Sequence, residues 1–149
     1  MAIYRHILIP TDGSRESEEA AEAGIRLGKA LGSRLTAVHV VPDAPRSGLE
    51  AWAHSDADFN RRVQESFEQR ALLVLEEIRE IAYRAGIACE CVMIRGGTPH
   101  EEILKAALEH ECDLIVMASH RIGASTELML DGETIKVLAR GPVPVLVYQ

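Results

Sequence analysis

The chain has few aromatic residues and few cysteines, and it lacks any long apolar run. Aromatic residues make up 4% of its 149 residues, and there are three cysteines. Three cysteines do not form the paired framework of a small disulfide-rich protein. No segment approaches the roughly 18 consecutive apolar residues of a membrane-spanning helix. We therefore expect neither a disulfide-stabilised fold nor an integral membrane protein.

An excess of positive charge is also absent. Lys and Arg total 16 against 23 for Asp and Glu, which gives a net charge of −7. This balance disfavours nonspecific binding to nucleic acid or to an anionic membrane. The apolar run at 7–10 is followed at once by Thr11-Asp12-Gly13 and is shorter than the core of a signal peptide. We expect a cytoplasmic protein without nucleic-acid or membrane partners.

The motifs of several enzyme classes are missing as well. The sequence contains no P-loop, no H-E-x-x-H and no G-x-S-x-G. Cys89, Cys91 and Cys112 have no further ligands at zinc-site spacing, so we interpret them as buried structural thiols and expect no metal. His39 lies inside an apolar run, and we interpret it as a hydrogen-bonded core histidine. We expect a protein that is not an enzyme.

What the chain does contain is an alternation of strand and helix patterns. Apolar runs predict strands at 4–10, 35–41, 88–94, 114–117 and 143–148. Helical periodicity predicts helices at 17–31, 59–85, 99–110 and 133–140, the third opened by a capping box at 98–101. The alternation predicts one α/β domain over residues 1–149, with an open, twisted five-stranded parallel sheet and helices on both faces. We expect the strand order 3-2-1-4-5.

This strand order predicts a crevice between the first and fourth strands. Asp12 follows the first strand, and Ala118-Ser119-His120 follows the fourth. Open α/β sheets bind ligands where the strand order reverses. We expect Asp12 and His120 to face each other there, with Val41 beside them. For Asp12 we favour a role in the turn with Gly13 over a role as a ligand.

Four segments of the chain resemble the universal stress protein family, relatives of adenine-nucleotide-binding α/β proteins. They are I-L-I-P-T-D-G-S at 7–14, A-V-H-V-V at 37–41, D-L-I-V-M-A-S-H at 113–120 and K-V-L-A-R-G-P-V-P-V-L-V at 136–147. They occur in the family's order over nearly the whole length. The resemblance implies an adenine-nucleotide alpha-hydrolase-like fold. It also implies that the backbone of Val41 meets adenine and that Asp12 reaches the ribose or a cation.

The nucleotide loop departs from the pattern of that family. Nucleotide-binding members carry Gly, two residues, Gly, nine residues, then Gly followed by Ser or Thr. The same positions here hold Ala118, Arg121, Asp131 and Gly132. Arg121 puts a long side chain where glycine lets the backbone approach phosphates, or it pairs with Asp131 and fills the site from within. Asp131 and Glu133 bring carboxylates to a helix start that favours anions, although Asp131 is equally a simple N-cap.

These departures favour a non-enzymatic, cytoplasmic stress-response protein with a degenerate nucleotide pocket, no cofactor and unidentified protein partners. The alternative is a family member that binds ATP or another adenine nucleotide, weakly, with slow hydrolysis. An enzyme acting on an adenylated small substrate is a third class, which no residue cluster supports. The candidate ligand-binding residues are Asp12, Val41, Ala118, Ser119, His120, Arg121, Asp131, Gly132 and Glu133.

The last predicted strand is expected to form a homodimer interface. Residues 143–148 are apolar on both faces and end a strand order that leaves them at the sheet's edge. An unprotected apolar edge favours pairing with another chain, here across a two-fold axis through Val143, Val145 and Val147. Pro144 has no N–H, which restricts the register. The alternative is a monomer whose edge is covered by a helix or loop.

Overall fold

The computed structural model describes residues 3–43, 57–121, 128–129 and 132–149. Its central sheet consists of β1 (His6–Pro10), β2 (Arg34–Val41), β3 (Cys89–Arg95), β4 (Leu114–Ala118) and β7 (Val145–Tyr148). The helices of the described part are α1 (Arg15–Leu31), α3 (Ala57–Ala85), α4 (Pro99–Glu109) and α5 (Gly132–Arg140). Two further short strands are β5 (His120–Arg121) and β6 (Leu128–Met129).

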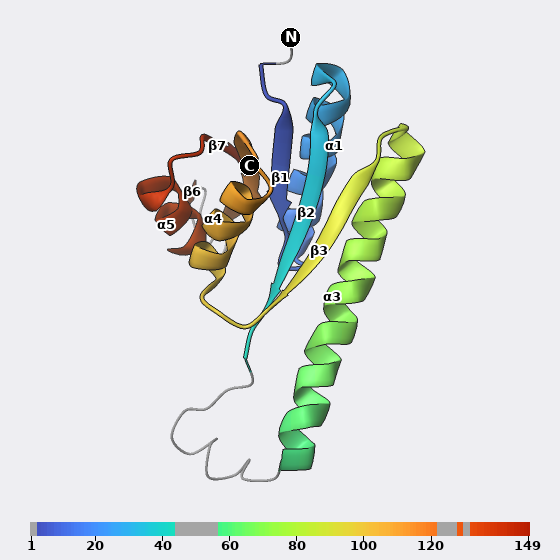
Figure 1. Cartoon of the computed structure of the whole chain (residues 1–149), viewed down its shortest axis with the longest axis vertical. Coiled ribbons are helices and arrows are strands. Elements are labelled where there is room, and N and C mark those ends of the chain that lie inside the picture. Colours follow the sequence, from blue (N-terminus) through green and yellow to red (C-terminus); the bar gives the residue numbers. More distant parts are fainter. Residues whose placement is uncertain (1–2, 44–56, 122–127, 130–131) are drawn as a thin grey trace.

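The sheet has the order β3-β2-β1-β4-β7, and all its strand pairs are parallel. The predicted order 3-2-1-4-5 is therefore confirmed, because β7 is the last of the five predicted strands. Helices α1 and α3 cover one face, and α4 and α5 cover the other (Figure 1). None of the helices in the described ranges combines the length and apolar character of a membrane span.

Small residues let α1 lie close to the sheet. Gly24 and Gly28 face β1 and β2, and an added Cβ at Gly28 would lie 2.5 Å from Leu35 Cδ2. At Gly24 the same atom would lie 3.0 Å from Ile9 Cδ1. Both strands are thereby shielded from water, and every residue of β1 is buried. This burial on both faces explains why the first strand is a continuous apolar run.

The starts of two helices differ in how they are capped. In α1, Ser14 is the N-cap, and its Oγ accepts a hydrogen bond from the Ser17 N–H at 3.2 Å. In α4, the predicted capping box is wrong, because the Thr98 side chain makes no capping hydrogen bond. The N–H of His100 instead donates to the carboxylate of Glu133 in α5. Local sequence predicted where α4 starts, but a distant residue supplies its cap.

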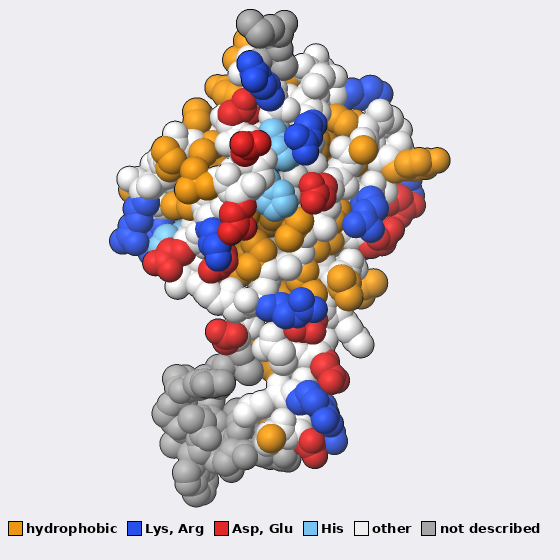
Figure 2. Space-filling view, viewed as in Figure 1, with side chains coloured by type: hydrophobic (Ala, Val, Ile, Leu, Met, Phe, Trp, Pro, Cys, Tyr) orange, Lys and Arg blue, Asp and Glu red, His pale blue; other side chains and the backbone are white. Residues whose placement is uncertain are grey.

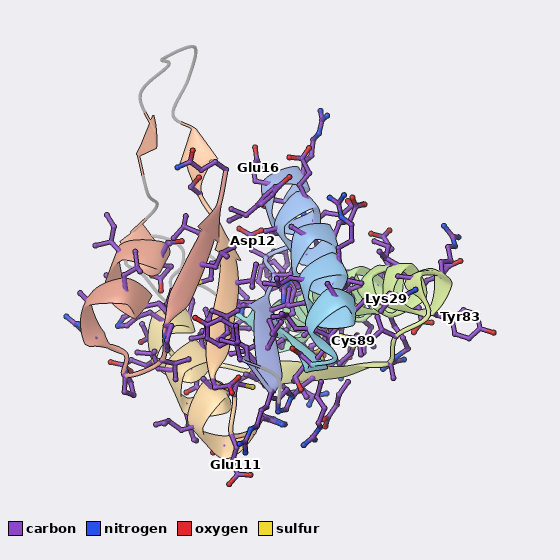
Figure 3. All side chains as sticks on the ribbon, turned by 90° about the horizontal axis from the view of Figure 1, so that it is seen from above. Asp12, Glu16, Lys29, Tyr83, Cys89 and Glu111 are labelled. Carbon is purple, nitrogen blue, oxygen red and sulfur yellow. The ribbon has the colours of Figure 1, made fainter. Side chains whose placement is uncertain are left out.

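Strands β5 and β6 form an antiparallel pair outside the main sheet, with His120 opposite Met129 and Arg121 opposite Leu128. Figure 3 shows the two short arrows apart from the body of the sheet. The sequence predicted only a loop between the fourth strand and the last helix. Two-residue strands are too short to produce the alternation from which strands are predicted.

Candidate functional site

A pocket of about 170 Å³ lies at the carboxyl ends of β1 and β4, where the strand order reverses. The topology predicted a crevice at this place. Figure 3 shows Asp12 there, beside the start of α1. The pocket is lined by Pro10, Thr11, Asp12, Ser17, Val38, Val40, Pro99, Ile103, Met117, Ala118, Glu133 and Thr134.

Much of the pocket wall is apolar, and it comes from elements on the α4 side of the sheet. Val38 and Val40 project from β2, Ile103 from α4 and Met117 from β4. Val38, Ile103 and Met117 belong to the buried core beneath α4 and α5, and Val40 packs against it. A pocket of this kind suits a flat, uncharged ring or another small apolar group.

The hydroxyl groups in the pocket hydrogen-bond to one another and to the backbone. The Ser17 hydroxyl donates to the Ser14 carbonyl at 2.9 Å, so it accepts from the Thr11 hydroxyl at 3.0 Å. Thr11 Oγ1 in turn accepts from the Gly13 N–H at 3.2 Å. Both side chains are buried, and this chain of bonds holds the turn between β1 and α1.

Asp12 also serves the turn between β1 and α1. Its Oδ1 accepts a hydrogen bond from the Ser14 N–H at 2.9 Å, which is the geometry of an Asx turn. The favoured prediction for Asp12, a turn residue, is thereby confirmed. Because Asp12 also lines the pocket, its carboxylate adds negative charge to the pocket rim.

Glu133 is the charged residue that connects α5 to α4 inside the pocket. Its Oε2 accepts hydrogen bonds from the backbone N–H of His100 at 2.7 Å and from His100 Nδ1 at 3.1 Å. Arg140 Nη1 lies 3.3 Å from His100 Nε2. A guanidinium group can only donate hydrogen bonds, so His100 Nε2 accepts from Arg140. The ring proton of His100 is therefore on Nδ1, which donates it in the hydrogen bond to Glu133. Lys136 Nζ lies 3.6 Å from the other carboxylate oxygen.

Carboxylates occupy the first turn of each helix that begins at this edge of the sheet. They are Glu16 and Glu18 in α1, Glu101 and Glu102 in α4, and Glu133 in α5. Helix N-termini attract anions through their unpaired N–H groups and their dipole. Here the side chains of the protein already supply negative charge, so these helix starts offer less to a phosphate group.

Three of the predicted site residues line the pocket, namely Asp12, Ala118 and Glu133. Val41 does not. Because alternate residues of a strand share a face, Val38 and Val40 face the pocket and Val41 faces α1 and α3. The Val41 carbonyl accepts a hydrogen bond from the Gly96 N–H at 2.9 Å.

Ser119 is also turned away from the pocket. Its N–H and its hydroxyl both donate to the Tyr148 carbonyl, at 2.9 and 3.3 Å. Gly132 is the first residue of α5 and does not line the pocket. Asp131 lies outside the described residues, and only the backbone of His120 and Arg121 is described, in β5. The expected contact of His120 with Asp12 and the expected pairing of Arg121 with Asp131 therefore depend on side chains that lie outside the described part of the chain.

Nine of the twelve residues that line the pocket were not predicted from the sequence, Val40 and Thr134 among them. The alternation of β2 could have identified Val40, since it shares a face with Val38. Thr134, fully buried, donates its hydroxyl to the Ala118 carbonyl at 3.1 Å and ties α5 to β4. No sequence signal pairs His100 with Glu133. Within the described ranges, no group of three or more His, Cys, Asp and Glu side chains could hold a metal ion.

The interpretation of His39 as a hydrogen-bonded histidine is wrong. It is 8% exposed, and neither ring nitrogen has a hydrogen-bond partner among the described residues. Burial lowers the pKa of His39 below its ordinary 6.5, and the negative charge of Asp12 opposes this effect only in part. His39 is therefore a neutral, buried ring beneath the Asp12 turn.

Comparison with known proteins gives the chain's relatives. The model of the universal stress protein family matches residues 3–149. A universal stress protein of Thermus aquaticus is 31% identical over 147 residues, which cover 99% of this chain and 100% of the relative. The solved structure of universal stress protein UspA from Lactobacillus plantarum has a TM-score of 0.82, at 20% identity and full coverage of both chains. A universal stress protein of Archaeoglobus fulgidus, solved in complex with dAMP, has a TM-score of 0.66 at 18% identity, again over both full chains.

Proposed function

This chain belongs to the universal stress protein family, and we propose that it is a non-enzymatic, cytoplasmic stress-response protein whose nucleotide pocket is degenerate. The observation that carries the proposal is the position of Glu133. Its carboxylate lines the pocket and receives the hydrogen bonds that the start of α4 could give to an anion. The three cysteines, none in a disulfide, fit a reducing compartment.

The charge of Glu133 opposes binding of a phosphate chain. Two unit charges 4 Å apart repel by about 4 kcal/mol at an effective dielectric constant near 20. Lys136 Nζ, 3.6 Å from the carboxylate, offsets part of this repulsion. The carboxylate of Asp12, which also lines the pocket, adds to the repulsion. A triphosphate therefore meets a less favourable site than an uncharged ligand of the same ring system.

An adenine-nucleotide-binding protein, with slow hydrolysis, is the second candidate. The apolar wall of Val38, Val40, Ile103 and Met117 favours it, since such a wall accommodates a purine ring. The Archaeoglobus fulgidus protein was solved with dAMP, which carries one phosphate. The two candidates differ in whether the phosphate groups of a nucleotide add affinity or remove it.

Titration calorimetry with adenosine, AMP and ATP, each with and without Mg²⁺, tests the proposal. We expect affinity to fall as phosphates are added, and ATP to bind most weakly. A dissociation constant for ATP in the low micromolar range would reject the degenerate pocket and favour the second candidate. Mass spectrometry of ligands released from the purified protein gives an independent readout. ATP that copurifies with the protein would likewise reject the degenerate pocket.

We also propose that the protein is a homodimer paired through β7. A residue of a parallel strand directs its N–H and C=O to the same side. The carbonyls of Pro144 and Tyr148 accept hydrogen bonds from the N–H groups of Ile115 in β4 and of Ser119 just after it. The carbonyls of Val145 and Val147 therefore face the open edge of the sheet. Pro144 therefore does not interrupt the edge, and Val143, Val145 and Val147 remain the proposed interface with a second copy. Other protein partners would be additional to this contact.

A further inference from the structure

The pocket at the carboxyl ends of β1 and β4 is lined by negative charge without positive charge. Asp12 and Glu133 are its charged lining residues, and none of the described residues that line it is Lys, Arg or His. We propose that this pocket takes a small organic cation, a flat ring with a short ammonium arm, and that the arm pairs with these two carboxylates. The inference rests on the proposed function, in which the apolar wall takes a ring and the carboxylates repel phosphate.

The groups around Glu133 leave most of its negative charge in place. The His100 ring accepts at Nε2 from Arg140 and donates at Nδ1 to Glu133, so it carries one proton and no net charge. It gives the carboxylate a hydrogen bond without neutralising it. Lys136 Nζ lies 3.6 Å from the carboxylate, but the Lys136 side chain is 46% exposed, so water and salt screen this pair. Glu133 therefore attracts a cation that enters the pocket.

The hydroxyl groups of the pocket offer acceptors to a ligand rather than donors. Thr11 gives its hydroxyl proton to Ser17, and Ser17 gives its own to the Ser14 carbonyl. The Thr134 hydroxyl donates to the Ala118 carbonyl. A hydroxyl group has a single proton and two lone pairs, so a ligand can only donate to these three oxygens. An ammonium group brings three N–H donors and complements them, whereas a phosphate or carboxylate group brings acceptors.

The size of the pocket limits the ligand to one ring system and a short arm. Its volume is about 170 Å³, and a cavity of roughly 150 Å³ is enough to enclose a benzene ring. Val38, Val40, Ile103 and Met117 supply the apolar wall against which a flat ring packs. On the face drawn in Figure 2, acidic and basic side chains of the described residues are interspersed. The charges inside the pocket, rather than a large one-signed surface on that face, therefore select the ligand.

Titration calorimetry with a matched series of nucleosides tests the proposal on the unmodified chain. The series is 5′-amino-5′-deoxyadenosine, adenosine and AMP, which share one ring system and carry a positive, a neutral and a negative group on the same carbon. We expect the amine to bind about tenfold more tightly than adenosine at low salt, because an attraction between the ammonium group and the carboxylates is added. This advantage should shrink at about 0.5 M NaCl, while the affinity for adenosine stays nearly constant.

The outcomes of this series separate the ammonium site from the proposed function. If the amine binds no better than adenosine while AMP binds more weakly than both, the ammonium site is overturned and the degenerate nucleotide pocket stands. If AMP binds more tightly than adenosine, the degenerate pocket is rejected, and the ammonium site is rejected with it. An amine that does not bind at millimolar concentration also overturns the ammonium site.

Variants of the two carboxylates give a result that a damaged fold cannot imitate. Glu133→Gln and Asp12→Asn each keep an oxygen that can accept from the N–H of His100 or of Ser14. Each variant should bind the amine about fivefold more weakly and AMP more tightly, so the two affinities move in opposite directions. A damaged pocket would weaken both. Glu101→Gln, outside the pocket, is the control and should change neither affinity. Parallel changes for the amine and AMP in the two carboxylate variants would overturn the proposal.

Discussion

The carboxylate of Glu133, in the first turn of α5, accepts a hydrogen bond of 2.7 Å from the backbone N–H of His100, in the first turn of α4. One side chain therefore occupies the anion-attracting start of a neighbouring helix as well as that of its own. This contact closes one end of the pocket with negative charge. It also holds α5 to α4 through the His100 ring, which Arg140 contacts on its other side.

Removing this charge should make the pocket accept phosphate groups more readily. Glu133→Gln keeps the shape of the side chain and a carbonyl that can accept from His100. We expect the affinity for AMP and ATP to rise by about tenfold, with adenosine affected less, since a like-charge repulsion is removed. Calorimetric titration measures this change. Glu101→Gln removes an equal charge from the first turn of α4 outside the pocket, so it should leave affinity nearly unchanged; equal gains in both variants would point to net charge alone.

Thr134 should contribute to stability through its bond to the Ala118 carbonyl. Thr134→Val has nearly the same shape but lacks the hydroxyl, so it leaves a buried carbonyl without that donor. We expect the free energy of unfolding to fall by about 1–3 kcal/mol, measured by urea denaturation. Thr98→Val is the control, because Thr98 makes no capping bond to its helix. A loss below about 0.5 kcal/mol for Thr134→Val would contradict the assignment.

The proposed dimer should depend on the exposed surface of β7. Leu146 is 40% exposed on this edge strand, and Leu146→Asp should yield monomers in light scattering while the circular dichroism spectrum is kept. Val145 would be a less suitable position, because its side chain packs against the core beneath α4 and α5 and its substitution would also affect folding. Leu73→Asp, exposed on α3 at the opposite edge, should remain dimeric. A monomeric mass for the unmodified chain at micromolar concentration would end the proposal.

Stability should fall as the solution becomes mildly acidic. Burial lowers the pKa of His39 and of His6 below the ordinary value of 6.5. Below pH 6.5 the unfolded chain therefore binds protons that the folded chain does not, which favours unfolding. We expect a constant thermal midpoint above pH 7 and a decline from pH 6.5 downward. His39→Gln should reduce the slope of this decline. His110→Gln, at a half-exposed position, is the control and should leave the slope unchanged. An unchanged slope in His39→Gln would contradict the role of burial.

The fold followed from the sequence because its signals are local and its rules general. The apolar run at 7–10 and the period of the helix at 15–31 each arise within a short stretch, and the handedness of crossovers then restricts the strand order. The same rule placed Asp12 and Ala118 at one edge of the sheet, where the pocket lies. These features can be predicted without knowing which side chains far apart in the sequence contact one another.

Tertiary structure alone decided the chemistry of each site. His100 and Glu133 are 33 residues apart, and no local sequence pattern predicts that the Glu133 carboxylate caps the helix that contains His100. Cys91 lines a groove beside α3 whereas Cys89 is buried, although the two cysteines share one strand and one face. Hydrogen bonding, burial and charge depend on distances through space between residues far apart in the chain. Sequence periodicity fixes which face a residue occupies, and only the packed fold fixes which atoms it meets there.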